Sequence, residues 1–142
     1  MRGRERLGQV SKSFRDLLVW QKSMQLAVQI YGLTKGFPRE EMYGLTSQMR
    51  RCVVSIPSNI AEGQGRANFA EFRQFLAIAR GSNCELQTQL ALARTLGFGN
   101  GNQIEDAEQL SEEIRRMLFG LLQALNSKKK TEPANSKLRT LN

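Results

Sequence analysis

Apolar residues recur every three or four positions in four long segments of this chain, and short polar or glycine-containing breaks separate the segments. This period is that of an amphipathic α-helix, and no stretch of useful length alternates as a half-buried strand would. The segments cover residues 13–35, 38–63, 68–96 and 102–126. Helices joined by short loops pack as antiparallel neighbours, so the sequence predicts an all-α fold, an up-down-up-down antiparallel four-helix bundle.

Residue pairs typical of helix N-termini begin three of the segments. In each pair a Ser or Asn stands three residues before an acid: Ser13 and Asp16, Asn68 and Glu71, Asn102 and Glu105. A left-handed glycine commonly ends a helix, so we expect Gly97 to end the third segment.

The first segment is apolar on two opposite sides. One stripe consists of Leu17, Trp20, Met24, Ala27 and Tyr31, and the other of Val19, Leu26, Ile30 and Leu33. A helix that is apolar on two sides is buried on two sides, whereas a monomeric bundle needs only one apolar face on each helix. We expect the first stripe to face the core and the second stripe to form a subunit interface in a homo-oligomer.

The apolar period of the second segment continues through a proline. Its stripe consists of Leu45, Met49, Cys52, Ile56 and Ile60, and Pro57 lies inside it. A loop would have no cause to keep this period, so we expect one helix that is kinked at Pro57 and ends at Gly63. The proline removes one backbone hydrogen bond and costs a helix about 3 kcal/mol.

Two interpretations exist for the turn Gly63-Gln64-Gly65-Arg66. A phosphate-binding loop would need a GK[ST] or GxGxxG spacing after a strand, and neither is present. The end of a helix followed by a turn explains both glycines and is the interpretation that we favour.

Small side chains occupy the second and third segments away from their apolar stripes. They let helices approach closely, and a mid-helix glycine such as Gly81 costs about 1 kcal/mol, so we expect a packing reason for it. Pairing the two faces predicts a buried polar network or interface that consists of Ser55, Asn59, Glu62, Arg80, Ser82 and Glu85. In it, Glu62 or Glu85 would pair with Arg51 or Arg80. The alternative is an ordinary solvent-exposed face.

Positive charge is concentrated near the two ends of the chain. The net charge is +8, from 21 cations and 13 acids. Residues 1–12, a basic N-terminal arm, carry +3, and residues 127–142, a basic tail that we expect to be disordered, carry +4. The bundle domain, residues 13–126, keeps +1, with an excess of cations before residue 100 and of acids after it.

Composition argues against an enzyme or a metalloprotein. Histidine is absent, which removes the commonest general base and the usual zinc and di-iron ligand, so we expect no catalytic residue, metal or cofactor. Cys52 and Cys84 lie far apart and are expected to be reduced, as in a cytoplasmic protein. No apolar run approaches the roughly 20 residues that span a bilayer, so no membrane association is expected.

The basic residues support a hypothesis of nucleic-acid association without catalysis. The candidate contacts with RNA or DNA are Arg50, Arg51, Arg66, Arg73, Lys128, Lys129 and Lys130. Binding of this kind is dominated by phosphates and insensitive to sequence. The alternative is a scaffold that binds a protein partner and does not touch nucleic acid directly.

Three stretches resemble a known family: DLLVWQKSMQLAVQIY, FPREEMYGLTSQMRRCVVSIPSNIAEGQGR and FRQFLAIARGSNCELQTQL. The resemblance is to the four-helix-bundle proteins encoded in intervening sequences of bacterial 23S rRNA genes, and it spans about residues 14–125. It implies a bundle that assembles into a ring, commonly a pentamer, without established enzymatic activity. It also implies kinship with the accessory proteins of diversity-generating retroelements, which are basic rings that bind nucleic acid and a reverse transcriptase.

Overall fold

The structure is a computed structural model that describes residues 13–131, and within this range it is all-helical and contains no strand. The four α-helices are α2 (Leu18–Thr34), α3 (Leu45–Gln64), α4 (Phe69–Leu96) and α5 (Gly101–Thr131). Two short 3₁₀-helices, η1 (Phe14–Asp16) and η2 (Arg39–Glu41), precede α2 and α3. The predicted all-α class and the predicted number of long helices are therefore confirmed for the described part of the chain.

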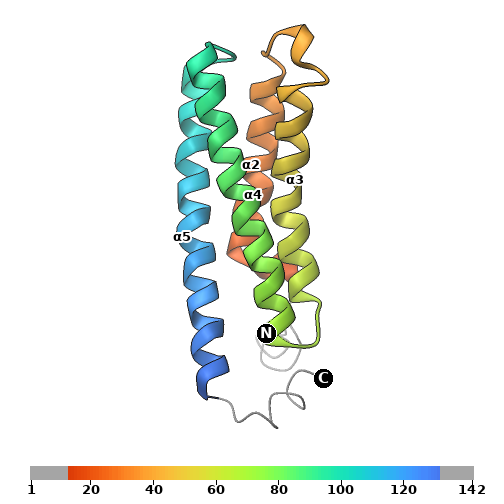
Figure 1. Cartoon of the computed structure of the whole chain (residues 1–142), viewed down its shortest axis with the longest axis vertical. Coiled ribbons are helices and arrows are strands. Elements are labelled where there is room, and N and C mark those ends of the chain that lie inside the picture. The colour runs from red at the N-terminus through yellow and green to blue at the C-terminus, as the bar shows by residue number, and fades with distance from the viewer. Residues whose placement is uncertain (1–12, 132–142) are drawn as a thin grey trace, which may run out of the picture.

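The four helices pack around one core (Figure 1). Helix α2 contacts α3 and α5, and α4 likewise contacts α3 and α5. Each helix contributes fully buried side chains, among them Leu26, Ile56, Leu86 and Leu118. Burial of a Leu or Ile side chain contributes roughly 1.5–3 kcal/mol, so this shared core holds the helices together.

Both predicted termini of α4 are confirmed. Asn68 caps its start, because the Asn68 side-chain oxygen accepts a hydrogen bond from the Glu71 amide at 2.7 Å. Gly97 ends it in the left-handed conformation, at φ 75°. Helix α4 thus begins and ends where its capping residues predicted.

Other termini differ from the prediction. Ser13 caps η1 and not a long helix, and α2 begins only at Leu18. The start of α5 is capped by Asn100, whose side-chain oxygen accepts from the Gln103 amide at 3.1 Å, and not by Asn102. Helix α5 continues to Thr131, five residues beyond the predicted end. The remaining tail and the arm 1–12 lie outside the described residues.

Pro57 lies inside α3, as the apolar period predicted. The helix runs through the proline without interruption and ends at Gln64, one residue later than expected. Gly63 is therefore part of the helix, where it is buried against α4. These residues are the end of a helix and a turn, not a loop shaped for phosphate.

The prediction of which apolar stripe of α2 faces the core is wrong. Val19, Leu26, Ile30 and Leu33, expected at a subunit interface, are at most 2% exposed and belong to the core of a single chain. In the other stripe, Met24 and Tyr31 are each 42% exposed. Helical periodicity shows that two apolar sides exist, but it contains no information on which side the neighbouring helices cover.

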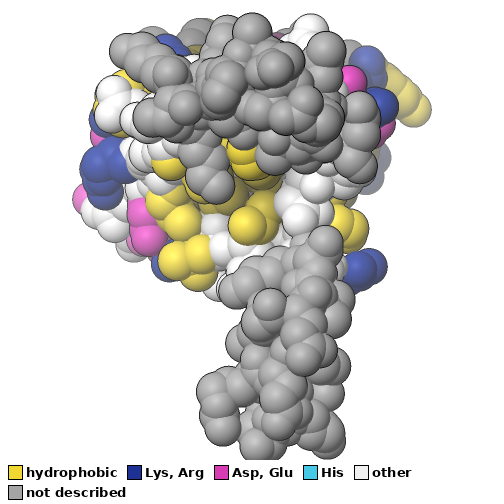
Figure 2. Space-filling model, turned by 90° about the horizontal axis from the view of Figure 1, so that it is seen from below, with side chains coloured by type: hydrophobic (Ala, Val, Ile, Leu, Met, Phe, Trp, Pro, Cys, Tyr) yellow, Lys and Arg dark blue, Asp and Glu magenta, His cyan; other side chains and the backbone are white. Residues whose placement is uncertain are grey.

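An apolar cavity of about 290 Å³ lies between the start of α2 and α5. Its lining consists of Leu17, Leu18, Val19, Met117, Gly120 and Leu121. Figure 2 views the bundle from the end where α2 starts and shows hydrophobic side chains at that surface. No helix in residues 13–131 is long and apolar enough to cross a membrane.

Candidate nucleic-acid interface

The four arginines predicted to contact nucleic acid do not form one cluster. Arg50 and Arg51 lie in the second turn of α3, while Arg66 follows the end of that helix. Fourteen residues of helix separate Arg50 from Gln64, the last residue of α3, which corresponds to about 21 Å along the axis. Arg73 lies near the start of α4, at the same end as Arg66. The set therefore divides into two pairs at opposite ends of α3.

Arg50 connects two helices instead of facing solvent freely. Its Nε donates to the Thr34 hydroxyl at 2.8 Å, and its guanidinium lies 4.7 Å from the centre of the Tyr31 ring. Cation–π contacts and hydrogen bonds of this kind each contribute about 1 kcal/mol. Arg50 is consequently a structural residue that joins α3 to α2.

Arg66 is also engaged within the chain. It pairs with Glu62 at 2.8 Å and approaches Glu71 at 3.8 Å, and its guanidinium lies 4.9 Å from the centre of the Phe75 ring. The two carboxylates offset its charge, so a phosphate would have to compete with them. This residue stabilises the turn between α3 and α4.

Arg51, Arg73 and Arg80 have no ion pair with any acid in the described part of the chain. Arg51 donates only to the Ser47 hydroxyl, at 3.3 Å. Arg73 and Arg80 are seven residues apart on α4, and two helical turns place them on the same face. Lys128, Lys129 and Lys130 lie in the last turns of α5. Arg50 likewise has no acid partner among the described residues, so the arginine charge of α3 and α4 that no acid neutralises is on Arg50, on Arg51 and on the α4 face.

The predicted pairing of small polar residues between α3 and α4 is present. The Ser55 hydroxyl donates to the Ser82 hydroxyl at 2.7 Å, and the Cys52 thiol donates to the Ser82 carbonyl at 3.0 Å. Asn59 donates to the Ser55 carbonyl at 2.7 Å. The two hydrogen bonds to Ser82 join α3 to α4 through side chains that are too short to separate the helices, whereas the hydrogen bond of Asn59 lies within α3.

The charged members of that predicted network are arranged differently. Glu62 pairs with Arg66, and the described residues contain no ion pair of Glu85 or Arg80. Glu85, Arg80 and Glu62 are all exposed. Glu85 borders a shallow cavity of about 280 Å³ with Gln48, Arg51, Cys52 and Ser55. The network is therefore hydroxyl- and amide-based, without a buried ion pair.

Burial and the nearby Glu85 carboxylate raise the pKa of the Cys52 thiol to about 12. Cys52 is 6% exposed, and the thiolate is the reactive form of cysteine. At neutral pH the side chain is a protonated hydrogen-bond donor. Cys52 consequently acts as a packing residue and not as a nucleophile.

Sequence reasoning missed a buried polar pair between α4 and α5. The Asn83 amide donates to the Ser111 carbonyl at 2.9 Å, and the Ser111 hydroxyl donates to the Asn83 side-chain oxygen at 2.8 Å. Both residues are fully buried. The sequence signal for this pair was the position of Asn83 in the apolar period of α4, between Ala79 and Leu86.

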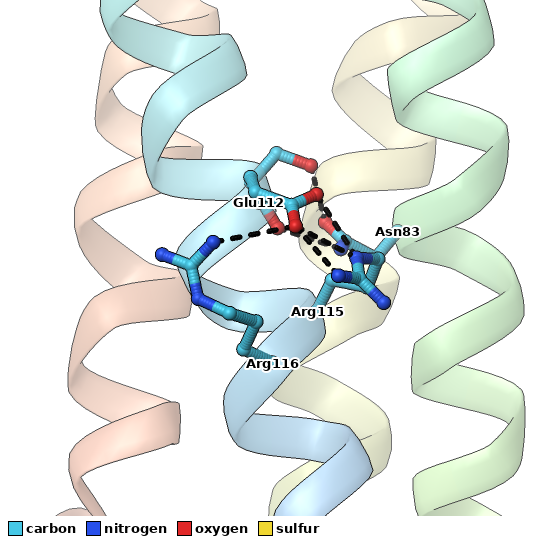
Figure 3. Close-up of polar contacts among 5 residues, drawn as sticks. Asn83, Glu112, Arg115 and Arg116 are labelled. Atoms are coloured by element: carbon cyan, nitrogen blue, oxygen red, sulfur yellow. Dashed lines mark hydrogen bonds and ion pairs between the residues drawn. The ribbon is translucent and has the colours of Figure 1, made fainter.

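Next to this pair, the surface of α5 carries paired charges (Figure 3). Glu112 accepts hydrogen bonds from Arg115 and Arg116, at 2.6 and 3.3 Å. The hydrogen bond with Arg115 holds the pKa of Glu112 below its usual value. Arg94 of α4 pairs with Glu108, and Lys22 of α2 pairs with Glu113. Residues 13–131 contain no group of His, Cys, Asp or Glu side chains that could hold a metal ion.

These features define an all-helical bundle protein with hydroxyl contacts between two helices and unpaired arginines on its surface. The chain belongs to the 23S rRNA-intervening sequence protein family, whose model matches residues 15–120. It is also similar to the crystal structure of a protein with unknown function from the S23 ribosomal protein family of Bacteroides thetaiotaomicron. The two share 28% identity at a TM-score of 0.69, over 75% of this chain and 96% of that chain. No curated protein matches the sequence.

Proposed function

We propose that this chain is a non-enzymatic, cytoplasmic homo-oligomer that associates with RNA or DNA through its cations. In each subunit the four helices would follow one another in up-down-up-down order, and α3 would bend at Pro57. The subunits would assemble into a ring. No reaction, metal or cofactor is part of this proposal. The kinship with retroelement accessory proteins remains an expectation from the resemblance.

The observation that supports nucleic-acid association best is the set of cations that no acid neutralises. Arg51, Arg73 and Arg80 have no ion pair within residues 13–131, whereas Arg66 and Arg94 do. The whole chain has a net charge of +8. Release of counterions from a polyanion favours binding to such a surface and makes it dependent on salt. The family takes its name from 23S rRNA, so RNA is the first ligand to test.

The test is a titration of labelled single-stranded RNA across a salt series. An Arg73→Ala/Arg80→Ala variant should weaken binding and reduce the log–log salt slope by about 0.7 for each phosphate that the protein no longer neutralises. Arg94→Ala is the matched control, because it removes an arginine from the same helix that is already paired with Glu108. Its slope should stay at the wild-type value.

A second variant lacks residues 1–12 and 132–142 and ends after α5. The deletion removes a net +3 with the arm and +1 with residues 132–142 but keeps Lys128, Lys129 and Lys130, so it should lower the remaining affinity and reduce the salt slope further. Sequence preference should be slight. If the intact protein binds neither RNA nor DNA at low salt, nucleic-acid association is refuted, and the scaffold with a protein partner takes its place.

A further inference from the structure

Both tyrosines of the chain are exposed, and both lie at the end of the bundle where α2 ends and α3 begins (Figure 1). Tyr43, in the turn before α3, is 95% exposed, and Tyr31, in the last turn of α2, is 42% exposed. Phe37, in the connection between the two helices, is buried instead, with its ring 5.7 Å from that of Phe98. This connection therefore turns one aromatic ring inward and leaves another in solvent.

The guanidinium of Arg50 is held flat beside one of these rings. It lies 4.7 Å from the centre of the Tyr31 ring, and its Nε donates to the Thr34 hydroxyl at 2.8 Å. Helix α2 thus fixes the position of an arginine that belongs to α3. A guanidinium plane can stack on a nucleobase, and its remaining N–H groups can donate to a phosphate.

The helix pair α2–α3 is the cation-rich half of the bundle. Between residues 18 and 61 the sequence holds two acids, Glu40 and Glu41, and five cations: Lys22, Lys35, Arg39, Arg50 and Arg51. The Glu41 carboxylate accepts a hydrogen bond from the Leu45 amide at 3.0 Å, so it is engaged at the start of α3. Lys22 pairs with Glu113, and the other four cations have no ion pair within residues 13–131. Positive charge therefore surrounds the two tyrosines.

The acids at the start of α5 lie on another side of the bundle. Lys22 contacts Glu113 and so marks the side of α2 that is next to α5. Tyr31 follows Lys22 by nine residues, or two and a half turns at 3.6 residues per turn, and it therefore lies on the opposite side of α2. Glu105 is level with Tyr31 but belongs to α5, so it does not offset the charge of Arg50.

A ligand that fits this surface combines negative charge with flat rings. A single-stranded nucleic acid has both, because its phosphates pair with cations and its bases stack on aromatic side chains and on arginine. In a duplex the bases stack on one another instead. An acidic peptide supplies the charge without a ring at every unit.

We propose that Tyr31, Tyr43 and Arg50 form a stacking platform for the bases of a single-stranded nucleic acid. Lys35, Arg39 and Arg51 would contact the phosphates of the same strand. This inference rests on the nucleic-acid association in the proposed function and names a contact that charge alone does not supply. Stacking is tolerant of sequence, because every base has a flat face.

The test compares a short uridine RNA with an abasic RNA of the same length, which keeps the phosphates and lacks the bases. The intact protein should bind the uridine strand about tenfold more tightly, since one base stacked on an aromatic side chain contributes about that factor. A thymidine DNA and its abasic counterpart form a second pair. Preference for bases in either pair supports the inference and identifies the strand that the protein takes.

The variant Tyr31→Leu/Tyr43→Leu removes both rings and keeps apolar side chains. It should bind the uridine strand about tenfold more weakly, with the wild-type salt slope, because no charge is lost. Its affinity for the abasic strand and for duplex RNA should stay at the wild-type value, which also shows that it is folded. Tyr31→Phe/Tyr43→Phe keeps the rings and should bind as the wild type does. Phe119→Leu is the matched control, because it removes a ring that is 50% exposed on α5.

Two results overturn the inference. One is equal affinity of the wild type for strands with and without bases, and the other is a Tyr31→Leu/Tyr43→Leu protein that keeps the wild-type preference. In addition, Tyr43→Leu alone should lose part of the preference, and at 95% exposure this substitution does not disturb the core.

The same titrations separate this inference from the proposed function. If strands with and without bases bind equally well, association through charge stands and the stacking platform is wrong. If no strand binds at low salt, nucleic-acid association is refuted and the platform with it. Arg73→Ala/Arg80→Ala should reduce the salt slope for both kinds of strand alike, whereas the leucine variant should reduce it for neither.

Discussion

At Gly63 a methyl group would collide with the neighbouring helix. A Cβ built there lies 2.7 Å from the Phe75 Cβ and 3.0 Å from the Phe72 ring. A Cβ built at Gly81, in contrast, has no atom from another helix and no side-chain atom within 4 Å. Packing within the bundle therefore does not require glycine at position 81, contrary to our expectation. The close approach of α3 and α4 depends on Gly63 instead.

Alanine substitutions at the two glycines should have opposite effects on stability. Gly63→Ala should lower the free energy of unfolding by about 1–3 kcal/mol, because it overpacks a contact between two helices. Gly81→Ala should raise it by about 0.5–1 kcal/mol, since alanine restricts the unfolded chain and favours helix. Urea unfolding monitored by circular dichroism measures both. Equal midpoints for the two variants would contradict this account of Gly63.

At the scale of helices, sequence patterns predicted the features that depend only on residues close together in the sequence. The caps at Asn68 and Gly97 and the passage of α3 through Pro57 are local features, and all three were predictable. The assignment of the α2 sides was wrong because burial depends on where the other three helices lie. Of the candidate site, the Ser55–Ser82 contact was predictable from small side chains at helical spacing. The engagement of Arg50 with Thr34 was not, because those residues meet only in the fold.

The Asn83–Ser111 pair should control how α4 and α5 fit together. Ser111→Ala leaves the buried Asn83 oxygen without its donor, and the free energy of unfolding should fall by about 1–3 kcal/mol. The double variant Asn83→Leu/Ser111→Ala removes both polar groups and should recover part of that loss. A double-mutant cycle from thermal unfolding measures the coupling. Additive losses would show that the two side chains do not depend on each other.

At the scale of the whole molecule, the reassignment of the α2 sides changes what a substitution should do. Leu26→Glu places a charge in the core, where the wild-type side chain is 0% exposed, and should unfold the chain. Val28→Glu replaces a residue that is 72% exposed and should leave the helical content unchanged. Circular dichroism spectra and melting curves of the two variants check this difference. A folded, merely dissociated Leu26→Glu protein would restore the original assignment.

Both ends of the described chain lie at one end of the bundle, since α2 begins and α5 finishes there (Figure 1). The arm of residues 1–12 carries +3 and the segment 127–142 carries +4, while Glu105 and Asp106 lie near the opposite end. Along α5 the charge changes from acidic near Glu105 and Asp106 to basic at Lys128, Lys129 and Lys130, so the described bundle is an electric dipole along its long axis. A polyanion exerts a torque on such a molecule before contact and turns the positive pole toward itself. In an assembly with parallel axes these dipoles add, so one rim of the assembly would meet the polyanion first.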